Sequence, residues 1–225
     1  MTNRLLTIVR IGKARNNFEN HYQNLFEELS TIGSGGFETV FKVKHRIDEH
    51  IYAIKRVQIE VKNLGKVRSE YVVLYYNSWP ENKHLYIQME YCSQNLRNIL
   101  EVKPKVFGRQ DEDAMDCVEY FISCEIFIQI LESVKYFHEL NPQIIHRDLN
   151  PENILISESV RNGRFVKLCD FGLAVEHITA SQSHSKNKGT PKYMAPELHQ
   201  SKYTTKADIY SLGIISVELF DITLE

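Results

Sequence analysis

The sequence has little cysteine, almost no net charge and no long hydrophobic run. Its four cysteines form neither a CxxC pair nor a zinc-ligand spacing with histidines, so we expect reduced, buried thiols and no disulfide scaffold. The 27 basic and 29 acidic residues leave a formal charge of −2, which excludes a globally basic protein that binds nucleic acid. No apolar run approaches the roughly 18 residues of a membrane helix, and residues 5–9 are too short for the core of a secretory signal. These absences predict a cytosolic or nuclear protein, taken here as cytoplasmic, without a membrane partner.

The composition that remains is that of a folded chain. Hydrophobic residues make up 43% and charged residues 25% of the 225 positions, so the depletion of apolar residues that marks disorder is missing. This length fits one large domain or two small ones.

Residues 1–24 carry scattered basic residues and an Asn-rich stretch without lasting periodicity, which predicts a leader or linker. From residue 26 the pattern changes to short β-rich runs with Gly-rich or charged connectors, which predicts a hairpin-rich antiparallel sheet. The expected strands are 26–32, 39–45, 51–57, 72–77 and 85–91, and one helical piece is expected at 60–67.

After Cys92 the hydrophobic period becomes helical. Apolar residues at three- and four-residue steps predict a long helix over 118–139, and a second apolar helix is expected over 205–221. Two short strands are expected at 153–157 and 165–169. The acidic stretch 102–117 is interpreted as an exposed loop, carrying Asp111, Glu112, Asp113 and Asp116. The predicted fold is therefore α+β, with a small sheet lobe at 25–92 and a mainly helical lobe at 93–225.

A glycine-rich segment lies between the first two expected strands and runs Ile32-Gly33-Ser34-Gly35-Gly36. Glycine lacks the Cβ that would keep a backbone away from a bound phosphate, but a plain hairpin turn explains the same residues equally well. Lys55 follows on a strand, where its point charge is suited to the α- and β-phosphates of a nucleotide.

Three motifs in the second half decide between these interpretations, because their order and spacing together are specific. They are His146-Arg147-Asp148-Leu149-Asn150-Pro151-Glu152-Asn153, Asp170-Phe171-Gly172 and Ala195-Pro196-Glu197. With them, the sequence resembles the eukaryotic protein kinases from about residue 26 onward. The resemblance implies a bilobal kinase fold, the cofactors ATP and Mg²⁺, and a protein substrate.

Residue roles follow from this resemblance position by position. Asp148 corresponds to the catalytic base, Asn153 and Asp170 to the magnesium ligands and Lys55 to the phosphate anchor. Asn150 takes the catalytic-loop position where Ser/Thr kinases carry a lysine. The nucleotide-binding residues implied are Ile32, Gly33, Ser34, Gly35, Gly36, Val40, Ala53, Lys55, Glu60, Met89, Glu90, Cys92, Leu155 and Asp170.

The same resemblance assigns residues around the nucleotide. Val40 and Ala53 are expected above the adenine, Leu155 below it, Met89 as gatekeeper and the backbone of residues 90–92 along its edge. A hydrophobic spine is implied as well, with Asp208 as its anchor. Its members are Leu64, His146 and Phe171.

Residues 33–57, 75–79 and 85–92 are similar to the kinases that phosphorylate the α subunit of translation initiation factor 2, with the first lobe most similar to the double-stranded-RNA-activated branch. This similarity implies a serine/threonine kinase in translational stress control, with that subunit as substrate and a kinase dimer as a partner arrangement. Between Gly172 and Ala195, the activation loop is expected to carry a regulatory phosphate on Ser185 or a neighbouring serine, with Thr190 also a candidate. A serine-rich loop without regulation is the alternative interpretation.

Four departures from the family pattern stand against full activity. Glu60, the expected partner of Lys55, follows it by only five residues, and Glu38 replaces the third glycine of the phosphate loop. An inward-pointing Glu38 is expected to weaken ATP binding. Asn150 supplies no cation for the transferred phosphate. The sequence ends at Glu225, before the further helices of the family, so a truncated kinase domain is expected.

Two functions therefore stay open. One is an active serine/threonine kinase. The other is a catalytically weak or inactive pseudokinase that binds nucleotide or regulates another kinase. A third possibility is that the chain is an incomplete part of a longer gene product.

Overall fold

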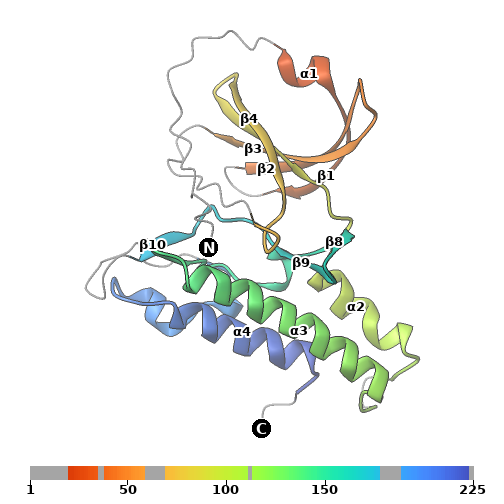
Figure 1. Ribbon diagram of the computed structural model, residues 1–225, viewed down its shortest axis with the longest axis vertical. Coiled ribbons are helices and arrows are strands. Elements are labelled where there is room, and N and C mark those ends of the chain that lie inside the picture. Colours follow the sequence, from red (N-terminus) through yellow and green to blue (C-terminus); the bar gives the residue numbers. More distant parts are fainter. Residues whose placement is uncertain (1–19, 35–37, 59–68, 111–112, 178–188, 223–225) are drawn as a thin grey trace. The chain divides into compact units, whose positions relative to one another are not determined.

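The computed structural model describes residues 20–34, 38–58, 69–110, 113–177 and 189–222. The chain divides into two compact units between Cys92 and Ser93. The first is built mainly of strands and the second mainly of helices (Figure 1). Within the described ranges, no helix combines the length and the apolar character needed to cross a bilayer.

The first unit holds one five-stranded sheet. Its elements are α1 (His21–Leu25), β1 (Phe26–Ser34), β2 (Glu38–His45), β3 (Ile51–Gln58), β4 (Tyr75–Glu81) and β5 (His84–Glu90). The strands are ordered β1-β2-β3-β5-β4, and every neighbouring pair is antiparallel. The antiparallel sheet expected from the short β-rich runs is confirmed.

An aromatic cluster forms the core of this unit. The Trp79 ring stacks against Phe26 and Tyr86, with ring centroids 5.8 Å and 5.5 Å away. Buried Glu81 accepts hydrogen bonds from the Trp79 indole at 3.0 Å and from the Tyr22 backbone N–H at 2.9 Å. Glu81 thereby pairs the indole N–H of Trp79 and the backbone N–H of Tyr22 inside this core.

Two boundaries in this unit differ from the prediction. Tyr22 is 5% exposed and packs in the aromatic cluster, so residues 21–24 belong to the folded unit and not to a leader. Strand β4 begins at Tyr75 and not at Val72, and it runs through Pro80. Proline is tolerated there because β4 is the edge strand of the sheet, where a missing N–H costs no ladder bond.

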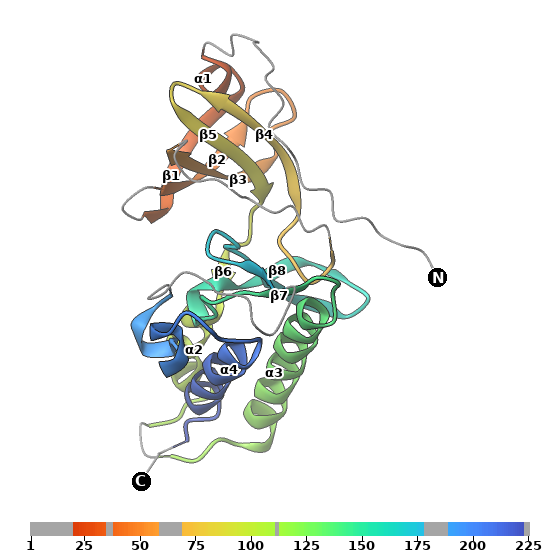
Figure 2. The same ribbon diagram turned by 90° about the vertical axis from the view of Figure 1, so that its left-hand side faces the viewer.

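The second unit places its two longest helices, α3 (Cys117–His138) and α4 (Lys206–Leu219), side by side (Figures 1 and 2). The remaining elements are β6 (Gln94–Asn95), α2 (Leu96–Val106), β7 (Gln143–Ile145), η1 (Pro151–Asn153), β8 (Ile154–Arg161), β9 (Arg164–Leu168), β10 (Val175–His177), η2 (Pro191–Tyr193) and η3 (Pro196–His199). Small antiparallel sheets pair β6-β8-β9 and β10-β7. The two long helices and the strands β8 and β9 confirm the sequence expectations.

The predicted exposed loop at 102–117 is wrong in part. Residues 102–106 form the last turn of α2. The side chain of Lys103 in this turn and that of Arg109 just after the helix are both buried. The Lys103 side chain is 3% exposed and lies 3.5 Å from Glu119, while Arg109 donates two hydrogen bonds to the same carboxylate at 2.6 Å and 2.8 Å. A buried acid with two cations holds this segment against α3. Asp111 and Glu112 lie outside the described residues.

Strands β8 and β9 form a hairpin with a two-residue turn. Asn162 and Gly163 have φ angles of 53° and 75°, the left-handed pair that such tight turns require. The pairing of Ile154 with Leu168 brings Asn153, just before β8, level with the residues that follow β9. The hairpin therefore aligns two of the motifs that the sequence singles out.

Candidate active site

Each unit carries one part of the predicted site. The sheet of the first unit carries residues that are expected to contact the phosphates and the adenine of a nucleotide. The register pairs Val40 with Lys55, Ala53 with Lys42 and Ala53 with Met89. Directly opposed residues share a face, and residues two apart on a strand do as well. Val40, Ala53, Lys55 and Met89 therefore lie on one face of the sheet, opposite the aromatic cluster, and Glu38 lies there too.

The side chain of Lys55 is paired within this sheet. Its Nζ lies 2.8 Å from Glu38 Oε2, with side-chain exposures of 8% for the lysine and 35% for the glutamate. Glu38 thus points toward the lysine, which is the inward arrangement that the sequence expectation linked to weaker ATP binding. Glu60, the other expected partner, lies outside the described residues.

The start of the phosphate loop is only partly described. Ile32 is 45% exposed and Ser34 ends β1. A Cβ on Gly33 would lie 3.7 Å from Val40, an ordinary contact, so the fold alone does not require glycine there. Gly35 and Gly36 lie outside the described residues.

In the segment expected along the adenine edge, Glu90 already makes hydrogen bonds to Leu74. The Glu90 backbone N–H donates to the Leu74 carbonyl at 2.7 Å, and its carboxylate accepts from the Leu74 N–H at 3.1 Å. The Glu90 amide is therefore occupied within its own unit. Leu155, the residue expected beneath the adenine, lies on β8 of the second unit.

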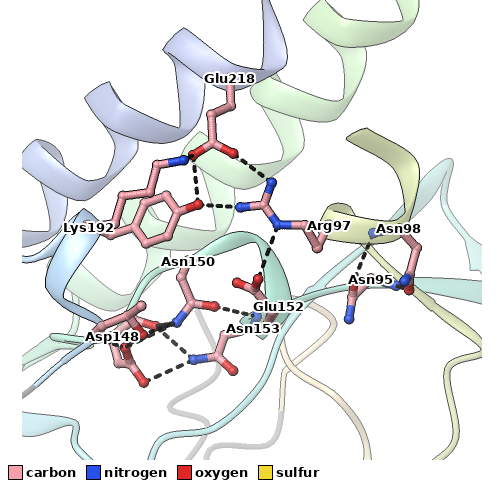
Figure 3. Close-up of polar contacts among 11 residues, drawn as sticks. Asn95, Arg97, Asn98, Asp148, Asn150, Glu152, Asn153, Lys192 and Glu218 are labelled. Atoms are coloured by element: carbon pink, nitrogen blue, oxygen red, sulfur yellow. Dashed lines mark hydrogen bonds and ion pairs between the residues drawn. The ribbon is translucent and has the colours of Figure 1, made fainter. Parts of the chain in front are cut away.

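Asp148 is the centre of the second unit's site (Figure 3). Its Oδ1 accepts hydrogen bonds from the Thr190 hydroxyl at 2.7 Å, the Thr190 N–H at 2.8 Å and the Asn150 amide at 3.1 Å. Its Oδ2 accepts from the Asn153 amide at 3.2 Å. The carboxylate is half-buried and is oriented by neutral donors from two segments 40 residues apart in sequence.

Asn150 holds the loop together instead of supplying charge. Its side chain is buried, donates to Asp148 and to the Thr190 hydroxyl, and accepts from the Asn153 backbone N–H at 3.0 Å. That last bond caps the short helix η1 in the way that asparagine caps helices. The cation that Ser/Thr kinases place here is thus replaced by an amide with a positioning role.

The residues expected to hold magnesium fit the ion's preference for oxygen. The Cys169 N–H donates to the Asn153 carbonyl at 3.0 Å, which ties Asn153 to the residue before Asp170. Asp170 has a φ of 56° and accepts from the Gly172 N–H at 3.2 Å. No cluster of three or more His, Cys, Asp or Glu side chains suited to a metal occurs in the described part of the chain. Mg²⁺ in phosphoryl-transfer sites uses one or two such side chains together with substrate phosphates, so Asn153 and Asp170 suit it.

The motif residues around this loop are anchored from α4. Buried Asp208 accepts from the backbone N–H groups of His146 and Arg147, both at 2.9 Å. The His146 ring lies 4.8 Å from the Phe171 ring, as expected for the hydrophobic spine. Buried Arg147 donates to the Tyr203 hydroxyl at 2.8 Å. Leu64 and Ser185 lie outside the described residues.

A pocket of about 450 Å³ opens beside Asp148. Besides Asp148, its lining consists of Arg97, Asn150, Glu152, Asn153, Thr190, Lys192 and Tyr193. Thr190 thus lies in the pocket wall, where a residue that contacts the substrate would be.

Sequence reasoning missed the ionic network on the rim of this pocket. Arg97 Nη1 lies 2.8 Å from Glu218 and its Nε lies 3.1 Å from Glu152, while Lys192 Nζ lies 2.8 Å from Glu218 (Figure 3). Burial alone raises the pKa of the Glu218 carboxyl, but hydrogen bonds from Lys192, Tyr193 and Arg97 outweigh it, and the pKa is lowered. Burial and the bond to Glu218 raise the pKa of the Tyr193 hydroxyl. The one local sign of this network is an arginine in the first turn of α2, where the helix dipole disfavours a cation.

The comparisons with known proteins agree with this geometry. Residues 26–223 match the protein kinase domain. The chain is 35% identical to the interferon-induced, double-stranded RNA-activated protein kinase of Rattus norvegicus, over 91% of this chain and 42% of the relative. It is 31% identical to serine/threonine-protein kinase cst-1 of Caenorhabditis elegans, over 88% of this chain and 38% of the relative.

A third relative is the membrane-associated tyrosine- and threonine-specific cdc2-inhibitory kinase of Drosophila melanogaster, 30% identical over 88% of this chain and 37% of the relative. The chain thus spans about two fifths of the length of these curated relatives. The α+β kinase fold expected from the motifs is confirmed by the domain match, and the resemblance to the double-stranded-RNA-activated kinases is confirmed by the relatives. The chain belongs to the protein kinase family.

Proposed function

We propose that this chain is an ATP- and Mg²⁺-dependent protein kinase that phosphorylates serine or threonine. The observation that carries the proposal is the Thr190 hydroxyl, which donates to Asp148 Oδ1 at 2.7 Å in an open pocket. A catalytic base must lie about 2.6–3.2 Å from the hydroxyl whose proton it accepts. A side-chain hydroxyl already occupies that geometry, so the loop can present a carboxylate to a serine or threonine of a substrate.

In this mechanism each residue has a separate task. Asp148 orients the substrate hydroxyl and accepts its proton, while the Asn150 and Asn153 amides hold the carboxylate in place. Lys55 binds the α- and β-phosphates of ATP. Asn153 and Asp170 would hold Mg²⁺, which neutralises charge on the phosphates when bound. Phosphoryl transfer depends mostly on such positioning and charge compensation.

The α subunit of translation initiation factor 2 is the substrate that we propose. Support comes from the similarity of the first unit to the kinases of that group and from the double-stranded RNA-activated relatives in rat and mouse. A role in translational stress control, a cytoplasmic location and a kinase dimer belong to the same proposal. The predicted kinase domain also belongs to this proposal, with its lobes divided between residues 92 and 93 and its first lobe extended from residue 25 to include residues 21–24.

Phosphorylation of Ser185 is proposed as the activating step. Arg147 would pair with the phosphate, and in the described conformation it donates to the Tyr203 hydroxyl and the Leu173 carbonyl. A phosphoserine carries about two negative charges and would compete for that guanidinium. Mass spectrometry of active protein should find phosphate on Ser185 or a neighbouring serine, and a fully active, unphosphorylated protein would contradict this step.

A pseudokinase is the second candidate, and two observations favour it. Lys55 is paired with Glu38 at 2.8 Å, and Asn150 offers the transferred phosphate an amide without charge. Such a module would bind nucleotide or regulate another kinase without transferring phosphate.

Labelled ATP separates these candidates. The full chain is incubated with Mg²⁺, γ-labelled ATP and the initiation-factor α subunit, beside Asp148→Asn and an Asp113→Asn control. The kinase proposal predicts label on serine or threonine with the unmodified chain and the control, and none with Asp148→Asn. Equal background label in all three would refute it and support the pseudokinase.

A further inference from the structure

The contact between Glu38 and Lys55 has the properties of an internal ligand. Lys55 is 6% exposed on the face of the sheet that carries Val40 and Ala53. Glu38 reaches it from the first position of β2, the residue next to the glycine-rich segment. Residue 38 opposes Val57, so its side chain lies diagonally across from Lys55 on the same face.

The two residues differ in how far water reaches them. The Lys55 ammonium is buried, whereas 35% of the Glu38 side chain is exposed. A buried ammonium needs a compensating anion, because desolvation makes an unpaired charge costly. An exposed carboxylate can swing into solvent at little cost. The lysine is therefore the fixed member of the pair and the glutamate the replaceable one.

We propose that Glu38 is an autoinhibitory residue whose carboxylate competes with the phosphates of a nucleotide for Lys55. The Glu38 carboxylate and the phosphates are all anions directed at the same ammonium. If Glu38 stays in place, its carboxylate repels the incoming phosphates at this partly desolvated site and weakens their binding. This inference rests on the proposed nucleotide site and adds its regulation by the chain's own carboxylate.

The proposal separates ligands by their charge. Adenosine carries no phosphate and does not compete with Glu38 for Lys55, whereas ADP and ATP do. Removal of the Glu38 charge should therefore tighten the binding of ADP and ATP and leave adenosine unchanged. A general effect on folding or on pocket shape would move all three ligands together.

Isothermal titration calorimetry of the full chain with adenosine, ADP and ATP, in the presence of Mg²⁺, tests this inference. Glu38→Gln removes the charge at nearly constant shape, and Glu38→Ala is the second variant should the amide perturb the loop. Glu49→Gln is the matched control, because Glu49 forms an exposed ion pair with Lys44 at the other end of β2. We expect both Glu38 variants to lower the Kd for ATP and ADP by about threefold to fivefold, the upper part of the range for release of a partly exposed ion pair. Adenosine and the Glu49→Gln control should stay within about twofold of the unmodified chain.

The outcomes distinguish this inference from the proposed function. Unchanged ATP affinity in both Glu38 variants, with adenosine still bound, would overturn the autoinhibitory role and leave the nucleotide site intact. Equal tightening of all three ligands would also overturn it. Binding of neither adenosine nor ATP by any form would refute the nucleotide site itself, and the inference with it.

Discussion

The buried charge cluster between α2 and α3 leads to a quantitative stability prediction for Glu119→Gln. The Glu119 side chain is fully buried, accepts two hydrogen bonds from Arg109 and lies 3.5 Å from Lys103 Nζ. Removal of one member of a buried ion pair costs about 3–5 kcal/mol, because its partner charge is left without compensation. Asp221 is 44% exposed and still contacts both cations, so the lower end of that range applies. We expect a loss of about 3 kcal/mol in the free energy of unfolding.

Urea unfolding followed by far-UV circular dichroism measures this loss. The only tryptophan, Trp79, lies in the first unit, so the helical signal is the better probe of the unit that carries the substitution. With a slope of about 2 kcal/mol per molar urea, the midpoint should fall by about 1.5 M. Glu139→Gln is the matched control, because Glu139 pairs with Lys135 on the surface, with side-chain exposures of 66% and 70%. That control should cost less than about 0.5 kcal/mol. Equal losses in the two variants would refute the cluster's role in holding α2 against α3.

Two further predictions concern the pocket. The lowered pKa of Glu218 means that its contribution to stability is present above its ordinary pKa of 4.5 and is lost as the pH falls through the lower, folded value. Glu218→Gln should therefore be less stable than the unmodified chain at pH 7, and the difference in Tm should shrink as the pH is lowered below 4.5. A difference in Tm that does not change with pH would contradict the assignment. Thr190→Val removes the hydroxyl between Asp148 and Asn150, which should cost about 1 kcal/mol of stability and slow phosphate transfer. Thr190→Ser keeps the hydroxyl and should preserve both stability and transfer rate. Equal transfer rates in the two variants would show that the hydroxyl has no part in the site.

The fold could be predicted largely from local sequence patterns, and the failures have physical causes. Short β-rich runs between Gly-rich or charged connectors located the strands of the first unit. Tyr22 was missed because it packs against aromatic residues of distant strands and its backbone N–H bonds to Glu81, 59 residues away. Lys103 lies in the stretch that its acidic residues predicted to be an exposed loop, and its burial depends on an acid outside that stretch. That acid, Glu119, lies on the next helix.

The site divides in the same way between local and long-range information. The motif around Asp148 predicted the residues that the second unit gathers, because they are close in sequence and their roles follow from the resemblance to kinases. The expected partner of Lys55, Glu60, lies outside the described residues, and the sheet register brings a second carboxylate, that of Glu38, to the lysine. The network of Arg97 and Glu218 joins residues 121 positions apart, so the local pattern shows only an arginine in the first turn of α2 and not its partner.

Asp148 is expected to act on the substrate hydroxyl and not on nucleotide binding. The most direct measurement is kcat for phosphate transfer at saturating ATP, for the unmodified chain and Asp148→Asn, with the Kd for ATP determined in parallel. We predict that kcat falls by at least about a hundredfold, the lower range for general base catalysis, while the Kd changes by less than about threefold. Equal kcat values in the two forms, or a substitution that weakens only the binding of ATP, would contradict this role of Asp148.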